Sequence, residues 1–171
     1  MKTNALSVAN YFIDLAQKEG TPIHLLGLVK RVYIAHGFAL ALLGRGLLDP
    51  RFDKVEAWKY GPVIPSVYHS FKQYKRDNIT TPTVMLYQDD NGDYDFKTPE
   101  IKNEQDKLIV EMVWKRYHDY SDNSLVDLTH MDGTPWKVCY KEGENKEIPD
   151  SFTELYYQKL VNIIVANGSL Q

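Results

Sequence analysis

Hydrophobic residues recur every three or four positions along much of this chain, the spacing that places them on one face of a helix. Four segments keep this spacing long enough to predict long helices, at about residues 4–18, 22–43, 100–120 and 152–167. The second segment has the most continuous apolar stripe and is followed by Gly44, a common stop for helices. We therefore expect a mainly α fold, a helical bundle around a central helix at about 22–43.

Capping residues indicate where several of these helices begin. Thr21 followed by Pro22 predicts an N-cap and a proline in the first turn of the second helix. Asp150 is a candidate N-cap for the last helix, and Ser121 for a short helix at about 124–131. The third helix carries its apolar residues at three-to-four spacing: Ile101, Leu108, Ile109, Met112, Val113 and Tyr120. In the last helix the spacing places these residues on the inward face: Phe152, Leu155, Tyr156, Leu160 and Ile163.

Two other segments favour extended backbone. Residues 83–97 contain two strand-like runs on either side of Asn91-Gly92, a pair suited to a tight turn, and predict a small β-hairpin. Residues 54–60 lack a helical stripe and lead into Gly61-Pro62, where the residue before proline disfavours helix. A short helix is expected at about 65–74.

Length and composition are those of one ordinary globular domain, which we expect to span residues 1–171. The N-terminal residues lack the apolar run of a secretory signal, and the longest apolar stretch, residues 32–43, is too short to span a bilayer. Cys139 is the single cysteine, which excludes an internal disulfide. These features predict a cytoplasmic protein that does not enter a membrane.

Charge and aromatic content bear on the kind of partner. The net charge is −3 and the basic residues are scattered, so direct nucleic-acid binding is not expected. Twelve Tyr and three Trp are many for this length, and both residue types favour half-exposed contact surfaces. Alternatively, most of them pack in the core with their polar ends outward. The composition favours protein–protein contact.

Candidate catalytic groups are few. No phosphate-binding glycine loop, nucleophile elbow or metal-binding histidine pair occurs, so we expect no enzyme, cofactor or metal. The one arguable nucleophile is Cys139 with His130, oriented by Asp127 or Asp132, although apolar neighbours favour a simple packing role for the cysteine. On the central helix, His36 is expected to be buried, neutral and bonded to a backbone carbonyl.

Two clusters combine aromatic residues with turn-forming glycine and proline. In residues 58–68, two prolines fix the backbone and hold Trp58, Tyr60 and Tyr68 close together. Residues 128–136 repeat this combination around a Gly–Thr–Pro–Trp turn. Either cluster could be an internal corner whose aromatics fill the core or a rigid surface that contacts a partner. The sequence leaves both interpretations open.

The first cluster, WKYGPVIPSVY, and the second, LTHMDGTPW, resemble the Panacea domain of SocA-like antitoxins, which also occurs in prophage-associated proteins. The similarity extends from SVANYFIDLA near the N-terminus to Tyr156-Tyr157. It implies a largely helical fold and a bacterial or phage-encoded antitoxin that neutralises a protein toxin by direct binding. Ten residues belong to the family pattern or to a possible partner-binding surface: Trp58, Tyr60, Gly61, Pro62, Val63, Tyr68, Thr129, His130, Pro135 and Trp136.

Family members pair with several unrelated toxin types, so the resemblance does not identify the toxin. Two other functions are compatible with the sequence. The chain could be a phage or prophage accessory protein, for example an adaptor that delivers a client to a protease, or it could be an undetected hydrolase. A homo-oligomer is possible in each case.

Overall fold

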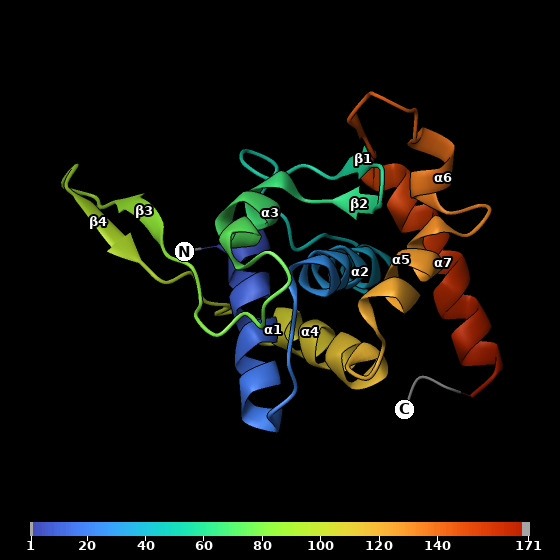
Figure 1. Ribbon diagram of the computed structural model, residues 1–171, viewed down its shortest axis with the longest axis horizontal. Coiled ribbons are helices and arrows are strands. Elements are labelled where there is room, and N and C mark those ends of the chain that lie inside the picture. The colour runs from blue at the N-terminus through green and yellow to red at the C-terminus, as the bar shows by residue number, and fades with distance from the viewer. Residues whose placement is uncertain (1, 169–171) are drawn as a thin grey trace.

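The computed structural model describes residues 2–168 and has a mainly α fold with two small antiparallel sheets (Figure 1). The helices are α1 (Ala5–Glu19), α2 (Leu25–Leu43), α3 (Pro65–Phe71), the 3-10 helix η1 (Lys72–Tyr74), α4 (Glu104–Tyr117), α5 (Asp122–His130), α6 (Pro135–Cys139) and α7 (Asp150–Ala166). The strands are β1 (Glu56–Trp58), β2 (Gly61–Val63), β3 (Met85–Gln88), β4 (Tyr94–Lys97) and β5 (Lys146–Glu147). The predicted fold class is confirmed.

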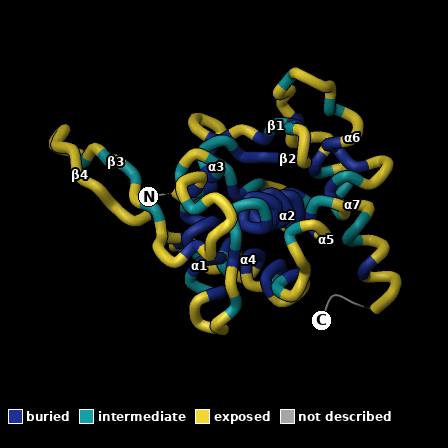
Figure 2. The backbone as a smooth tube through the Cα atoms, viewed as in Figure 1, coloured by how far each residue is buried: buried dark blue, intermediate teal, exposed yellow. Residues whose placement is uncertain are grey.

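Helix α2 runs through the middle of the molecule, where α1, α4, α5 and α7 pack against it (Figure 1). Every residue from 27 to 40 is buried, and Figure 2 shows this helix as a dark core. Burial on all sides explains why its apolar pattern in the sequence is nearly continuous. By length and composition alone α2 could cross a membrane, but the fold buries most of it.

The central helix begins at Leu25, three residues later than the Thr-Pro pair predicts. The cause is a set of bonds to a distant segment. The backbone N–H of Ile23 donates to the side-chain oxygen of Asn78 at 2.9 Å, and the N–H of Ile79 donates to the carbonyl of Ile23 at 2.9 Å. These tertiary bonds outweigh the local preference of Pro22 for a first helical turn.

Helix α7 is rotated from the orientation that its sequence predicts, since Tyr156 and Leu160 pack against the core as expected but the other predicted residues do not. Tyr157 is buried against α2, where a Cβ on Gly37 would overlap the tyrosine ring. The ring also meets Phe38 edge to face, with centroids 5.1 Å apart. Seating this large side chain sets the rotation of the helix. Four residues of the predicted apolar stripes, in α4 and α7, are exposed: Leu108, Phe152, Leu155 and Ile163.

His36 is buried as predicted, but its predicted partner is wrong. Its Nδ1 accepts a hydrogen bond from the backbone N–H of Leu47 at 3.2 Å, and its Nε2 lies 2.9 Å from Asp150 Oδ1. An Nδ1 that accepts leaves the ring proton on Nε2, where it can be donated to the carboxylate. Asp150 is therefore the anchor of His36 and not the helix cap that the sequence predicts, since Pro149 holds the cap position.

The predicted extended segment is confirmed and forms one strand of a small sheet. Strands β1 and β2 pair antiparallel around a turn at Lys59 and Tyr60, which places Trp58 opposite Gly61. Strand β5 pairs with the other edge of β1. Gly61 has a φ of +105°, a conformation open to glycine and strained for other residues. This sheet packs over the N-terminal half of α2 through β2 (Figure 1).

The predicted β-hairpin is also confirmed, and it projects from the body as an arm, here defined as residues 83–98 (Figure 1). The side chain of Asn10 in α1 holds both ends of the arm. Its Nδ2 donates to the carbonyls of Thr83 and Pro99 at 3.0 and 3.1 Å, and its Oδ1 accepts from the N–H of Thr83 at 2.9 Å. The chain therefore leaves and re-enters the body at one point.

Candidate protein-binding site

The fold brings the two aromatic clusters together. The indole N–H of Trp136 donates a 2.7 Å hydrogen bond to the backbone carbonyl of Trp58, across 78 positions of sequence. Strand β2, from the first cluster, packs against α5, from the second. The two sequence motifs are therefore two halves of one structural unit over α2.

Lys30 of α2 lies at the centre of this unit and is fully buried. Its Nζ donates to the carbonyl of Pro62 at 3.0 Å. Burial disfavours the charged ammonium and lowers the pKa of Lys30 to about 7. A Cβ on Gly61 would lie 2.8 Å from Lys30 Cε and 3.1 Å from Thr129 Oγ1, so Gly61 makes the room that the lysine occupies.

Sequence reasoning did not single out Lys30. A signal was present, because Lys30 and Arg31 interrupt an otherwise continuous apolar stripe in the most hydrophobic helix. Arg31 is also buried, and its guanidinium donates to the carbonyls of Tyr117, the last residue of α4, and of Tyr120 on the loop that follows, at 3.0 and 3.1 Å. Charged side chains are rarely buried without hydrogen-bond partners. A charged residue inside an apolar stripe therefore indicates that the fold supplies polar groups to bind it.

His130 and Trp136 stack face to face, with ring centroids 3.8 Å apart and planes 21° apart. Tyr140 extends the stack on Trp136 at 4.6 Å. Burial and the neighbouring Lys30 lower the pKa of His130, and its Nε2 is a buried nitrogen with no hydrogen-bond partner among the described residues. The stack joins α5 to α6 through flat ring faces.

The arrangement gives little support to a cysteine nucleophile. A reactive cysteine needs a base in hydrogen-bond contact and a lowered pKa. Burial raises the pKa of the Cys139 thiol instead, and the cation that influences it is Lys146, while His130 is stacked on Trp136. Among residues 2–168, no three His, Cys, Asp or Glu side chains group into a possible metal site.

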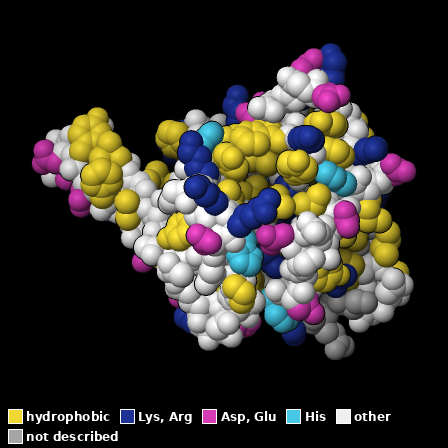
Figure 3. Space-filling view, in the orientation of Figure 1, with side chains coloured by type: hydrophobic (Ala, Val, Ile, Leu, Met, Phe, Trp, Pro, Cys, Tyr) yellow, Lys and Arg dark blue, Asp and Glu magenta, His cyan; other side chains and the backbone are white. Residues whose placement is uncertain are grey.

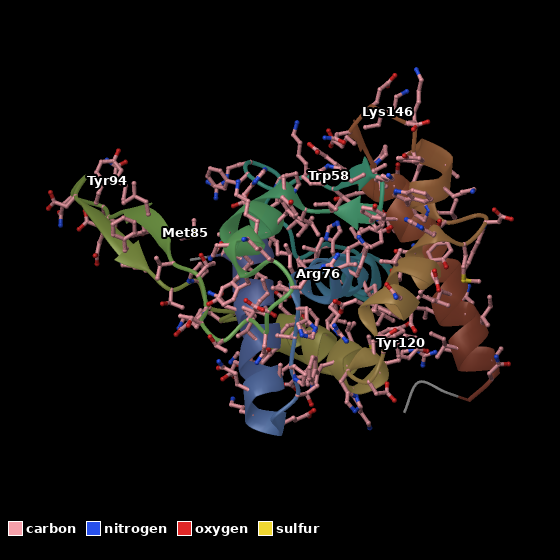
Figure 4. All side chains as sticks on the ribbon, in the orientation of Figure 1. Trp58, Arg76, Met85, Tyr94, Tyr120 and Lys146 are labelled. Carbon is pink, nitrogen blue, oxygen red and sulfur yellow. The ribbon has the colours of Figure 1, made fainter. Side chains whose placement is uncertain are left out.

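Beside the buried unit lies an open apolar hollow, the aromatic groove, between α2, the β1–β2 turn and α3. It has a volume of about 360 Å³ and is walled by Val29, Trp58, Tyr60, Val63 and Tyr68. Figure 3 shows hydrophobic side chains gathered at this place, and Figure 4 labels Trp58 there. Aromatic, concave and water-accessible, the groove has the composition of a protein contact site.

Two of the three aromatic side chains of the groove are held by packing, and the third is open to water. Trp58 and Tyr68 meet edge to face with centroids 5.0 Å apart, and the Trp58 indole N–H donates to Glu56 at 2.7 Å. Tyr60 stands at the turn with 61% of its surface exposed, and the ammonium of Lys59 lies over its ring. Rigid aromatics lose little entropy when a partner covers them.

The ten predicted motif residues divide by burial. Gly61, Pro62, Val63, Thr129, Pro135 and Trp136 are buried. Trp58, Tyr68 and His130 are half-buried, and Tyr60 is exposed. The structure brings all ten into one region. The buried residues build the structural unit over α2, and the half-buried or exposed aromatic residues reach the surface.

A second and slightly larger hollow, of about 450 Å³, lies at the root of the arm between α1 and residues 98–102. Its walls include Asn10, Asp14, Glu100 and Lys102, so it is more polar than the aromatic groove. It contains none of the ten motif residues. We therefore take the aromatic groove as the candidate site.

The chain belongs to the family described as antitoxin SocA-like, Panacea domain, whose model matches residues 28–137. The matched range begins in α2 and ends in α6, and so contains both halves of the buried unit. Among curated proteins, the chain is similar to Antitoxin SocA of Caulobacter vibrioides (strain NA1000 / CB15N), with 32% identity over 135 residues, covering 79% of this chain and 69% of that protein. No solved structure matches the chain significantly.

Proposed function

We propose that this protein is an antitoxin that silences a protein toxin in the cytoplasm by occupying part of its surface, without turnover. Membership of the SocA-like antitoxin family supports a toxin partner. The unfavourable surroundings of Cys139 and His130 support binding over catalysis. We propose the aromatic groove as the contact surface, with the whole chain acting as one domain.

The observation that carries this proposal is the position of Tyr60 in the aromatic groove. This tyrosine is 61% exposed and lines the hollow together with Trp58 and Tyr68, so it belongs to a contiguous apolar patch of the kind that marks an interaction site. Truncating an anchoring aromatic at the centre of an interface typically costs about 2–4 kcal/mol of binding free energy. We expect a loss of this size for Tyr60→Ala if the groove contacts the toxin.

The test uses the product of an adjacent gene that stops growth when it is expressed alone. Toxin activity is titrated with the purified protein, and full inhibition is expected near equimolar ratio. Tyr60→Ala should weaken inhibition, whereas Tyr120→Ala, at an exposed site on the loop after α4, should not. Full inhibition at strongly substoichiometric ratios, with a covalent change in the toxin, would show that binding alone is the wrong mechanism.

A further inference from the structure

The arm carries an apolar face that the rest of the chain leaves uncovered. In the β3–β4 register Leu86 pairs with Phe96, and strand alternation places Val84 and Tyr94 on the same face as this pair. These four side chains are 53–70% exposed. The opposite face of the hairpin carries Tyr87, under the ammonium of Lys97 at 4.2 Å.

A two-stranded hairpin alone is marginally stable in water, because it has no core of its own. The arm is tied to the body at its root, through Asn10, and by a weak contact of Asn4 with Met85 Sδ at 3.8 Å. Neither contact touches the face of Leu86 and Phe96. An exposed apolar face on a projecting hairpin indicates a surface that is covered in an assembly.

The tip of the arm is acidic. Four aspartates lie within seven residues: Asp89, Asp90, Asp93 and Asp95. The carboxylate of Asp89 holds the turn by accepting from the N–H groups of Asn91 and Asp93, at 2.9 and 3.0 Å. Asp90 and Asp93 are exposed. The arm therefore presents apolar side chains next to negative charge.

The aromatic groove has the complementary character. Its walls are apolar, and its charged lining residues in the described chain are all lysines, namely Lys30, Lys59 and Lys75. Lys59 and Lys75 are exposed at its rim, and Lys30 lies buried beneath it. The nearby carboxylate of Glu56 is engaged by the Trp58 indole. An apolar, acidic segment is the ligand that such a groove would attract.

We propose that the arm of one copy of this protein seats in the aromatic groove of a second copy, and that the exchange is reciprocal. Figure 3 shows hydrophobic side chains on the arm and around the groove on the same face of the molecule. Two copies placed face to face, with a two-fold axis between these patches, therefore bring each arm over the partner's groove. Both contacts form together and close the assembly as a dimer.

The dimer does not depend on the proposed function, because it requires no toxin. The effect of the dimer on toxin neutralisation does rest on the proposed antitoxin function. The second copy and the toxin would compete for Trp58 and Tyr60, so self-association would hold the groove closed until toxin is present. Toxin would then shift the population toward the complex by mass action.

The experiment reverses charge on each side of the contact. One variant carries Asp90→Lys with Asp93→Lys on the arm, and the other carries Lys59→Glu with Lys75→Glu at the groove. Molecular mass is measured by light scattering and sedimentation over a concentration series, with the unmodified protein expected to be a dimer. Each variant alone should dissociate about tenfold or more readily, because like charges then face each other.

An equimolar mixture of the two variants should dimerise again. In the mixed pair, one contact joins lysines on the arm to glutamates at the groove, and the other keeps the original charges. Phe96→Ser should weaken the dimer with no change of charge, and Lys115→Glu with Lys159→Glu, on exposed positions of α4 and α7, should leave it intact. A monomer at every concentration, or variants that fail to pair when mixed, would overturn the proposal.

The two proposals fail in different ways. A monomeric protein that still neutralises toxin, and loses this activity in Tyr60→Ala, would reject the arm exchange and retain the groove as the toxin site. A dimer that obeys the charge reversals but does not inhibit the toxin would reject the proposed function alone.

Discussion

The indole N–H of Trp136 lies 2.7 Å from the backbone carbonyl oxygen of Trp58 and joins the two family motifs. Trp136→Phe should keep the ring stack but leave this carbonyl without its donor, at a cost of about 1–2 kcal/mol in the free energy of unfolding. Trp58→Phe removes a bond of equal length, to Glu56, at a more exposed site and should cost less. Urea unfolding measures both, and equal losses would contradict the joining role.

Gly61 provides a second test of the same unit. Gly61→Ala should destabilise the protein by about 1–3 kcal/mol, because a side chain at φ +105° is strained and its Cβ would press on Lys30. Gly143 also has a positive φ, of +76°, but a Cβ there meets nothing within 4 Å. Gly143→Ala therefore measures strain alone. If both variants lose the same stability, the close packing against Lys30 is unimportant.

Lys30 should make stability depend on pH in the alkaline range. Burial lowers its folded pKa to about 7, below the ordinary value of 10.5, so the unfolded chain binds more protons between these values. The free energy of unfolding should therefore rise as pH increases from about 7 toward 10. Lys30→Met, which replaces the titrating amine with an apolar side chain of similar length, should lose this rise. Denaturation at several pH values, compared with the exposed control Lys115→Met, gives the result.

Asp150 should make stability depend on pH in the acidic range. Its hydrogen bond with His36 lowers the folded pKa of the carboxyl below its ordinary value of 3.8. The stabilisation is then present above the unfolded pKa and is lost as pH falls through the lower folded value. Asp150→Ala should destabilise the protein at neutral pH and flatten this acid dependence, whereas Asp77→Ala, at an exposed position, should do neither. An unchanged acid profile in Asp150→Ala would mean that the bond to His36 contributes nothing.

The sequence predicts those features of the fold that depend on residues close together along the chain. The central helix follows from its apolar stripe, and the arm follows from Asn91-Gly92 between two strand-like runs. Both motifs were recognisable because glycine, proline and aromatic residues recur in short, ordered segments. The helix start at Leu25 was missed because the bond between Ile23 and Asn78 joins residues 55 positions apart.

The candidate site could be predicted in part. Its ten residues were named from two separate motifs, but nothing local indicates that Trp136 would reach Trp58, or that Gly61 would make space for Lys30. The exposed face of α7 was misassigned because Tyr157, which fits against Gly37, sets the rotation of the helix more strongly than the smaller apolar residues do. The burial of Lys30 and the complementarity of distant surfaces are properties of the assembled fold.

The attachment of both ends of the arm to Asn10 makes the length of the arm independent of the helical core. Because both ends of residues 83–98 are held by one side chain, strand residues can be added or deleted beyond that point without a break in the helical core. Changes by pairs of residues in each strand preserve which side chains share a face. The length of the arm can therefore vary without a change in the helical core, whereas its apolar and acidic chemistry must stay matched to the aromatic groove, which belongs to the same chain.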